Sequence, residues 1–226
     1  GRTSFTLPSA MKLSEKLFGN WVIAAKRSLF MPVNRSVPDV AEKRKNWNGL
    51  ISGFKASDLV FLDESGCNTD MTRRYAYSFG GSRAVDSAPL SKPKNTTILS
   101  SIQLDGTLRY TTFSGGTTVA RFKRYLETDL LPHLNGNSVL VMDNMKSHHA
   151  KAVKNLLDSS GIRYIYLPPY SPDLNPIEKL WPKVKAFLRK FKARTLDTLP
   201  DAIQHAFQNV SPSDCSGWFK FCDYLH

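Results

Sequence analysis

The sequence has little of three features that define common classes of protein. It has three cysteines, Cys67, Cys215 and Cys222, and none of them is part of a CxxC pair, which argues against a disulfide framework and a cysteine-based zinc site. No apolar run approaches the roughly 18 residues of a membrane-spanning helix. Acidic residues are also scarce, since 19 Asp and Glu stand against 31 Lys and Arg, a net charge of +12. Such a chain favours a polyanionic partner, most often nucleic acid, over an anionic membrane surface.

The basic excess lies in two short segments. Residues 1–56 carry ten basic and three acidic residues, and residues 179–194 carry seven basic and no acidic residues. Residues 57–178 between them are nearly neutral, with 13 basic and 12 acidic residues. A solvated helix face would explain either segment alone, but the concentration of charge favours two elements that contact phosphates. The candidates in the second segment are Lys179, Lys183, Lys185, Arg189 and Lys190.

Hydrophobic periodicity and turn signals predict an α/β order of elements. Asp105-Gly106 joins two β-branched runs, which predicts a hairpin within residues 95–113. Asn175 as N-cap and Pro176 at the first helical position open a last main helix. The other predicted elements are helices at 39–51, 117–134 and 148–158 and strands at 59–65, 138–144 and 162–168. The early strands are antiparallel and the later ones are connected by helices, which indicates a ribonuclease-H-like mixed sheet flanked by helices.

Three acidic residues stand where such a fold places its site. Asp63 and Asp143 each follow a buried apolar strand, and Glu178 lies in the first turn of the last main helix. The 34 residues between Asp143 and Glu178 suffice for a helix, a strand and a loop that brings the chain back alongside. Converging carboxylates without His or Cys ligands favour Mg²⁺ or Mn²⁺. Two such ions can serve phosphodiester chemistry.

Each of these acids also has an ordinary structural interpretation. An Asp at a strand end is commonly a turn or N-cap residue, and Asn175-x-x-Glu178 has the spacing of a capping box. For Glu178 taken alone, the cap is the better interpretation. The three acids as a set, flanked by basic segments, favour the metal site.

Three blocks of sequence resemble a known family. VFLDESG, VLVMDNMKSHH and LPPYSPDLNPIEKLW, in this order, resemble the catalytic blocks of the mariner-superfamily DDE transposases. The nearest branch is the bacterial insertion-sequence group with an Asp-Asp-Glu triad, which shares the 34-residue gap. The resemblance runs from about residue 26 to 195 and implies a ribonuclease-H-like fold. It also implies Mg²⁺-dependent cleavage of element ends and strand transfer into a TA dinucleotide of double-stranded DNA.

The resemblance assigns roles residue by residue. Asp63, Asp143 and Glu178 match the metal-binding catalytic triad, with two ions of Mg²⁺ or Mn²⁺ as the expected cofactors. Asn144 and His148 match residues after the second Asp, and the resemblance implies positioning roles for both, although a lone His near a strand end is more often structural. The match further implies that Arg73 and Arg74 contact the DNA backbone. SPDLNP, residues 171–176, resembles the tight loop that sets Glu178 against the sheet.

The sequence departs from the family at two places. Only about 30 residues precede the linker, too few for the complete helix-turn-helix module of the family. We therefore expect residues 1–38 to be a truncated DNA-binding remnant and linker, and residues 39–226 to form the catalytic domain. Pro182 cannot donate a hydrogen bond to the carbonyl of Glu178, so we expect a kinked or loosened first helical turn there.

The expected activity is that of a transposase catalytic domain, homodimeric when full length and without a membrane partner. Such a protein would be cytoplasmic and nucleoid-associated in a bacterium, and nuclear in a eukaryote. Two alternatives remain open. One is a ribonuclease-H-like nuclease that cuts without joining, and the other is an inactive DNA-binding relic of a transposase. A plain basic scaffold protein is disfavoured by the length of the third block.

Overall fold

The computed structural model describes residues 37–72, 78, 80, 82–83, 85, 93–193 and 195–225. All of them belong to one compact unit. Arg73 and Arg74 lie outside the described residues. No helix in the described part is long and apolar enough to cross a membrane. The three cysteines are all buried and free.

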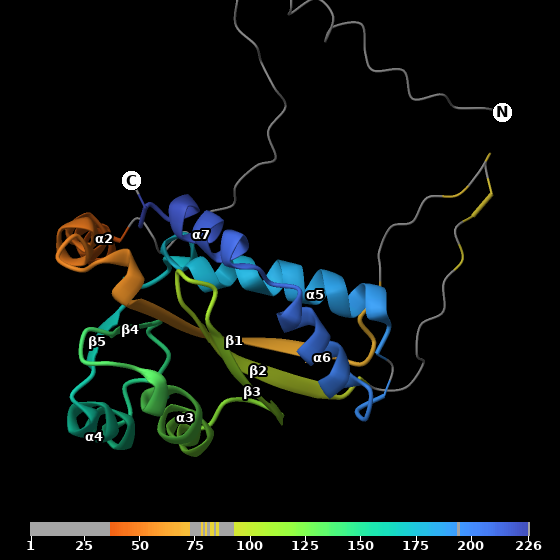
Figure 1. Cartoon of the computed structure of the whole chain (residues 1–226), viewed down its shortest axis with the longest axis horizontal. Helices are drawn as coiled ribbons and strands as arrows, with labels where there is room; N and C mark the ends of the chain where they lie inside the picture. The colour runs from red at the N-terminus through yellow and green to blue at the C-terminus, as the bar shows by residue number, and fades with distance from the viewer. Residues whose placement is uncertain are drawn as a thin grey trace, which may run out of the picture. The chain divides into compact units, whose positions relative to one another are not determined.

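A five-stranded sheet of order β3-β2-β1-β4-β5 forms the centre of the fold (Figure 1). The strands β1, β2 and β3 pair antiparallel, and β4 pairs parallel with both β1 and β5. This is the mixed sheet expected from the order of elements. The strands are β1 (Leu59–Asn68), β2 (Asn95–Ile102), β3 (Leu108–Ser114), β4 (Val139–Met142) and β5 (Arg163–Tyr166).

Helices cover both faces of the sheet. They are α2 (Pro38–Ile51), α3 (Val119–Tyr125), α4 (Lys151–Ser160), α5 (Leu180–Phe191), α6 (Leu199–Gln208) and α7 (Pro212–Phe221). One core cluster joins Phe61 and Val141 to residues of α5, α6 and α7, and a second joins Val60 and Leu140 to residues of α3 and α4. Figure 1 shows the same two layers of helices on opposite sides of the sheet. Because side chains alternate along a strand, neighbouring residues of β1 face different layers.

One predicted helix differs from the structure for a reason that involves proline, and two observed helices were not predicted. The helix predicted at 117–134 is α-helical only to Tyr125. A π-helical turn (Leu126–Leu130) and a 3-10 turn (Leu131–His133) follow it. Pro132 has no N–H to donate and crowds the preceding turn, so a regular helix cannot continue through it. The helices α6 and α7 have no counterpart among the predicted elements, although Ser211 and Asp214 form a capping box that marks the start of α7.

Candidate active site

Strand register sets the first two acids side by side. The parallel pairing of β1 with β4 includes Phe61↔Val141, and the same register continued by two residues brings Asp63 beside Asp143. The prediction that Asp63 ends its strand was wrong, because antiparallel pairing with β2 continues to Asn68. Asp63 instead lies within β1, beside the point where the parallel strand β4 ends. Asp143 follows the last residue of β4, as predicted.

Asp63 is a buried carboxylate held by one indole. Its exposed fraction is 8%, and Trp181 Nε1 donates a hydrogen bond to its Oδ2 at 2.9 Å. Burial raises the pKa of Asp63 to about 7; the bond from Trp181 opposes this shift, and the negative charges of Glu178 and Glu64 add to it. Sequence reasoning missed Trp181, although its spacing of three residues from Glu178 could have placed the two on one side of a helix.

Asp143 lies in a turn that supplies several donors. The backbone N–H of Met145 donates to its Oδ1 at 2.9 Å, and His148 Nδ1 lies 2.8 Å from the same atom. Burial acts to raise the pKa of Asp143, but these hydrogen bonds and the charge of His148 outweigh it, so the pKa lies below its usual value. Asp143 therefore stays ionised where Asp63 resists ionisation.

His148 links Asp143 to a fourth acid. Its ring is fully buried, stacks on Phe122 at 4.1 Å, and places Nε2 3.2 Å from Oε1 of Glu64. Burial acts to lower the pKa of His148, but the bonds to Asp143 and Glu64 outweigh it and raise the pKa to about 9. The imidazole is therefore charged at neutral pH. Sequence reasoning missed Glu64, which faces the layer opposite Asp63 because it is the next residue of β1.

Asn144 ties the turn after β4 to the end of β5. Its Nδ2 donates to the carbonyl of Leu167, and His149 Nε2 lies 3.0 Å from its Oδ1. The side chains of Asn144 and His148 thus lie where a positioning role would place them.

Glu178 stands on a 3-10 turn, Pro176–Lys179, that precedes α5. The loosened first turn expected from Pro182 is confirmed, since the α-helix begins only at Leu180. The capping-box interpretation fails, because Asn175 makes no side-chain cap hydrogen bond. Burial raises the pKa of Glu178, and the charge of Asp143 adds to this while Lys185 and Lys179 oppose it.

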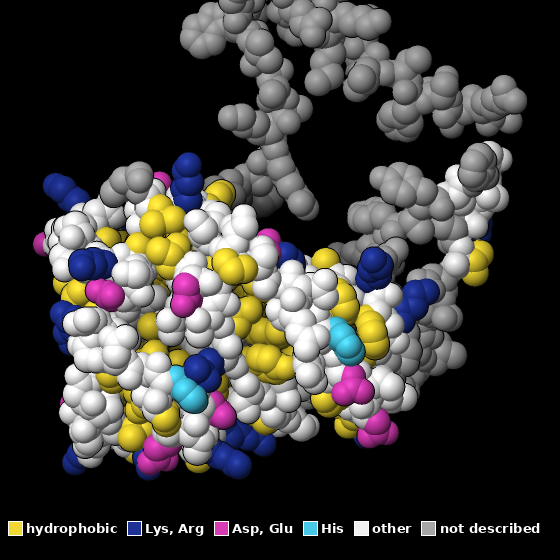
Figure 2. All heavy atoms as spheres, in the orientation of Figure 1, with side chains coloured by type: hydrophobic (Ala, Val, Ile, Leu, Met, Phe, Trp, Pro, Cys, Tyr) yellow, Lys and Arg dark blue, Asp and Glu magenta, His cyan; other side chains and the backbone are white. Residues whose placement is uncertain are grey.

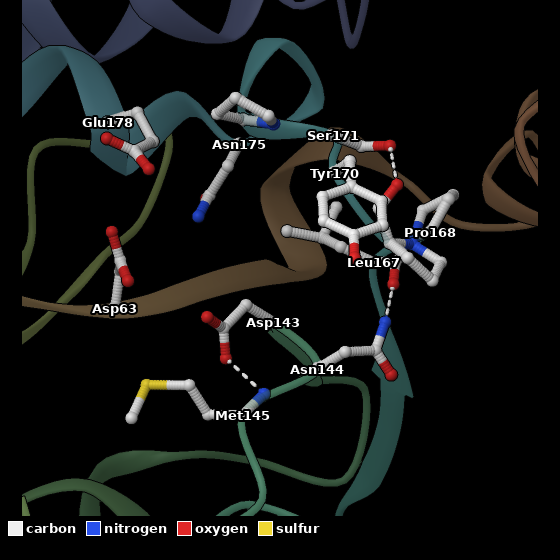
Figure 3. A pocket seen from close by; sticks show the side chains of 12 residues that line it. Asp63, Asp143, Asn144, Met145, Leu167, Pro168, Tyr170, Ser171, Asn175 and Glu178 are labelled. Carbon is white, nitrogen blue, oxygen red and sulfur yellow. Dashed lines mark hydrogen bonds between the residues drawn. The ribbon is translucent and has the colours of Figure 1, made fainter. Parts of the chain in front are cut away.

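The three acids line one pocket of about 400 Å³ (Figure 3). Asp63 comes from β1, Asp143 from the turn after β4, and Glu178 from the 3-10 turn. Figure 3 shows the carboxylates of Asp63 and Glu178 facing each other across it. On its rim, Tyr170 is 49% exposed and has a φ of 55°, a left-handed conformation that is uncommon for a residue other than glycine. The remaining lining residues are Asn144, Met145, Leu167, Pro168, Pro169, Ser171, Pro172 and Asn175.

The predicted DNA-contacting residues of α5 fall into two groups. Lys185 and Arg189 line a second pocket that shares Asp63 and Glu178 with the first, and Lys190 is exposed. Lys183 instead pairs with Asp214, and Lys179 lies 3.8 Å from the ring centre of Phe221. On the face that Figure 2 shows, basic and acidic side chains are interspersed and do not form one basic patch.

The three carboxylates have the chemistry that suits a hard cation, but their present arrangement is not that of a bound metal site. Three carboxylates on one pocket supply the oxygen ligands that Mg²⁺ and Mn²⁺ prefer. The charge of Glu178 raises the pKa of Asp63, and the charge of Asp143 raises the pKa of Glu178; a bound cation would relieve both repulsions. Within the described residues, however, no three His, Cys, Asp or Glu side chains meet the geometry of a metal site.

Comparisons with known proteins found one curated relative and several solved structures of similar fold. The Tcb2 transposase of Caenorhabditis briggsae is 32% identical over 75 residues, which are 33% of this chain and 28% of that protein. The structure resembles the Mos1 transposase paired-end complex with left transposon end, with a TM-score of 0.75 and 18% identity over 95% of this chain and 67% of that one. It also resembles the Mos1 catalytic domain solved with raltegravir and Mg, with a TM-score of 0.63 and 19% identity over 83% and 92% of the two chains.

These matches settle the fold and the family. The ribonuclease-H-like mixed sheet predicted from the sequence is confirmed. The chain spans less than a third of the curated relative that it matches. Residues 58–200, more than half of the chain, match the DDE superfamily endonuclease family and include Asp63, Asp143 and Glu178. The chain therefore belongs to the DDE superfamily endonucleases.

Proposed function

We propose that this chain is the catalytic domain of a metal-dependent DNA transposase of the mariner superfamily. It would cut the ends of a mobile element and join them to target DNA at a TA dinucleotide. The observation that carries the proposal is the convergence of Asp63, Asp143 and Glu178 on one pocket in a DDE endonuclease. The proposed branch is the bacterial insertion-sequence group, whereas the matching curated relative comes from a nematode.

We further propose that the triad holds one or two divalent cations. The Mos1 paired-end complex has been solved with Mn and with Mg. Such ions, when bound, activate the attacking oxygen and stabilise the leaving oxygen of a phosphodiester. Asp63, Asp143 and Glu178 would be their ligands.

The remaining residues of the site would orient these ligands. The charged His148 and the Met145 N–H hold Oδ1 of Asp143, and Figure 3 shows its other oxygen turned toward Asp63. Trp181 fixes Oδ2 of Asp63 in the same way. Asn144, through its bond to Leu167, keeps the turn after β4 in place.

The proposed partner is double-stranded DNA. Lys185 and Arg189 lie beside the triad, where their charges would meet backbone phosphates. Arg73, Arg74, Lys179, Lys183 and Lys190 complete the proposed contact set. Residues 1–38 would contribute to DNA binding and link to the catalytic domain, residues 39–226, of a homodimer. The protein would act in the nucleoid of a bacterium or in the nucleus of a eukaryote.

Nicking of supercoiled plasmid in Mg²⁺ or Mn²⁺ tests the proposal. The wild-type chain should nick, and Asp143→Asn should lower the rate by at least about 1,000-fold, because the ligand that stays ionised is lost. Equal nicking rates for the two proteins would show that Asp143 is not a catalytic metal ligand. A strand-transfer assay with a free DNA 3′ end then separates a transposase from a nuclease that cuts without joining.

One observation favours a second candidate, an inactive DNA-binding relative. In the described residues, the acids do not form a ready-made metal group. Calorimetry of Mn²⁺ binding to the wild type and to the triple variant Asp63→Asn, Asp143→Asn, Glu178→Gln separates the two. Binding that the triple variant loses supports the enzyme, and equal binding supports the relic.

A further inference from the structure

Asn175 has a buried polar side chain whose oxygen lacks a partner among the described residues. It is 2% exposed, and its Oδ1 is buried and accepts no hydrogen bond from the described residues. It stands at the N-terminal cap position of the 3-10 turn but does not cap it. Most buried polar atoms in proteins are paired, so this unpaired oxygen marks Asn175 as a side chain whose polar groups the fold alone does not satisfy.

The amide points into the pocket of the triad. Asn175 lines that pocket, and Figure 3 shows its nitrogen turned toward the space between Glu178, Asp63 and Asp143. Two other polar residues of the lining already donate within the protein, since Asn144 Nδ2 donates to the Leu167 carbonyl and Ser171 to the Pro169 carbonyl. Asn175 therefore offers an uncommitted N–H beside the three acids.

A neutral donor suits this position. A phosphodiester that enters a pocket walled by carboxylates gains from hydrogen-bond donors aimed at its non-bridging oxygens. A Lys or Arg in this place would pair with Glu178 or Asp63 and neutralise a ligand, whereas an amide N–H donates without doing so.

We propose that Asn175 is a further catalytic residue, which donates a hydrogen bond from Nδ2 to a non-bridging oxygen of the phosphate under attack. The inference rests on the proposed function and extends it. The competing role is metal ligation, because an amide has a donor at one end and an acceptor of nearly the same shape at the other. If the amide is turned around, Oδ1 faces the pocket and would serve as a metal ligand.

Three measurements on Asn175→Ala and Asn175→Asp test the role. For Asn175→Ala we expect Mn²⁺ affinity within about twofold of wild type and plasmid nicking slower by about 100-fold, the effect of losing one donor to developing charge. Affinity for a short DNA duplex in Ca²⁺ should fall by about three- to tenfold. Asn175→Asp should nick more slowly still, because it replaces the donor with a fourth negative charge, and should bind Mn²⁺ at least as tightly.

Asn137→Ala is the matched control, since Asn137 is exposed in the turn before β4 and outside the pocket. It should match the wild type in all three measurements. Unchanged nicking by Asn175→Ala would overturn the inference, and so would a loss of Mn²⁺ affinity above about tenfold, which would assign ligation instead. If the wild type and Asp143→Asn both fail to nick, the proposed function fails first and takes this inference with it. Thermal unfolding of each variant confirms that it is folded.

Discussion

Asp63 and Asp143 lie at the same level of neighbouring strands, yet their carboxyl groups meet opposite surroundings. Asp63 is almost fully buried and has one side-chain donor, Trp181, so its pKa rises to about 7. Asp143 is more exposed and has two strong donors, His148 and the Met145 N–H, so its pKa falls below the usual value. The difference shows that the deeper burial of Asp63 and the charged donor beside Asp143, more than the position on the sheet, set the charge of each acid.

This comparison gives the two acids different parts in the proposed site. Asp143 is ionised before any cation arrives and serves as the anchor. Asp63 is near its midpoint at neutral pH, so a cation that binds there displaces a proton from a large share of the molecules. The burial of Asp63 and the charged His148 beside Asp143 separate the two environments.

The largest effect is expected on removing His148. His148→Ala leaves the carboxylate of Glu64, whose side chain is 7% exposed, buried without its partner. We expect the free energy of unfolding to fall by about 3–5 kcal/mol, measured by chemical denaturation. Adding Glu64→Gln should recover part of the loss. His205→Ala, at an exposed histidine of α6, is the control, and an equal effect there would contradict the account.

Next, the two acids should respond with opposite signs to the same substitution. Unfolded Asp63 ionises near pH 3.8 and folded Asp63 near 7, so its charge weakens the fold as pH rises through this range. Asp63→Asn should therefore stabilise the metal-free protein at pH 8 by about 2–4 kcal/mol. Thermal unfolding across pH measures this, and the gain should shrink as pH falls from 7 toward 4.

Asp143→Asn is the matched variant. Because the folded-state pKa of Asp143 is lowered, its charge stabilises the fold above the unfolded pKa. The substitution should destabilise the protein at pH 8 by about 1–3 kcal/mol, the loss of a charge-assisted hydrogen bond. The same sign for both variants would contradict the comparison.

How far the sequence predicted this site depends on the kind of contact. The strands and the three acids follow from apolar runs and spacing, because local pattern sets both. Trp181, Glu64 and the unpaired Asn175 required the fold, since Asp63 and Trp181 meet across 118 positions of sequence. Asn175 shows the limit most clearly: its spacing to Glu178 fits a capping box, but no cap bond forms where Pro182 has loosened the turn.

A smaller effect is expected when the hydrogen bond from Trp181 to Asp63 is removed. Trp181→Phe removes the indole N–H that favours ionised Asp63, so the pKa of Asp63 should rise above about 7. The pH midpoint of Mn²⁺ binding, followed by calorimetry, should move up by about one unit. Trp218→Phe, a tryptophan substitution in α7 away from the pocket, should leave the midpoint unchanged. An equal shift of the midpoint in both variants would show that the Trp181 hydrogen bond does not set the pKa of Asp63.

The smallest effect is expected when the loop that leads to Glu178 loses its contacts with Arg44. Arg44 of α2 bonds Ser171 and both oxygens of Asp173, in the loop that leads to Glu178. Arg44→Ala should lower stability by about 1 kcal/mol and slow nicking a few-fold, while the pKa values of Asp63 and Asp143 stay in place. Lys43→Ala, which breaks an exposed pair with Asp39, is the control and should change neither stability nor nicking.

The central claim is that the triad forms one divalent-metal site, and crystals grown with Mn²⁺ test it most directly. The account predicts an anomalous peak in the pocket, at about 2.0–2.3 Å from carboxylate oxygens of Asp63 and Asp143 or of Asp63 and Glu178. The peak should be lost in Asp143→Asn. A peak elsewhere, with none in the pocket, would contradict the account.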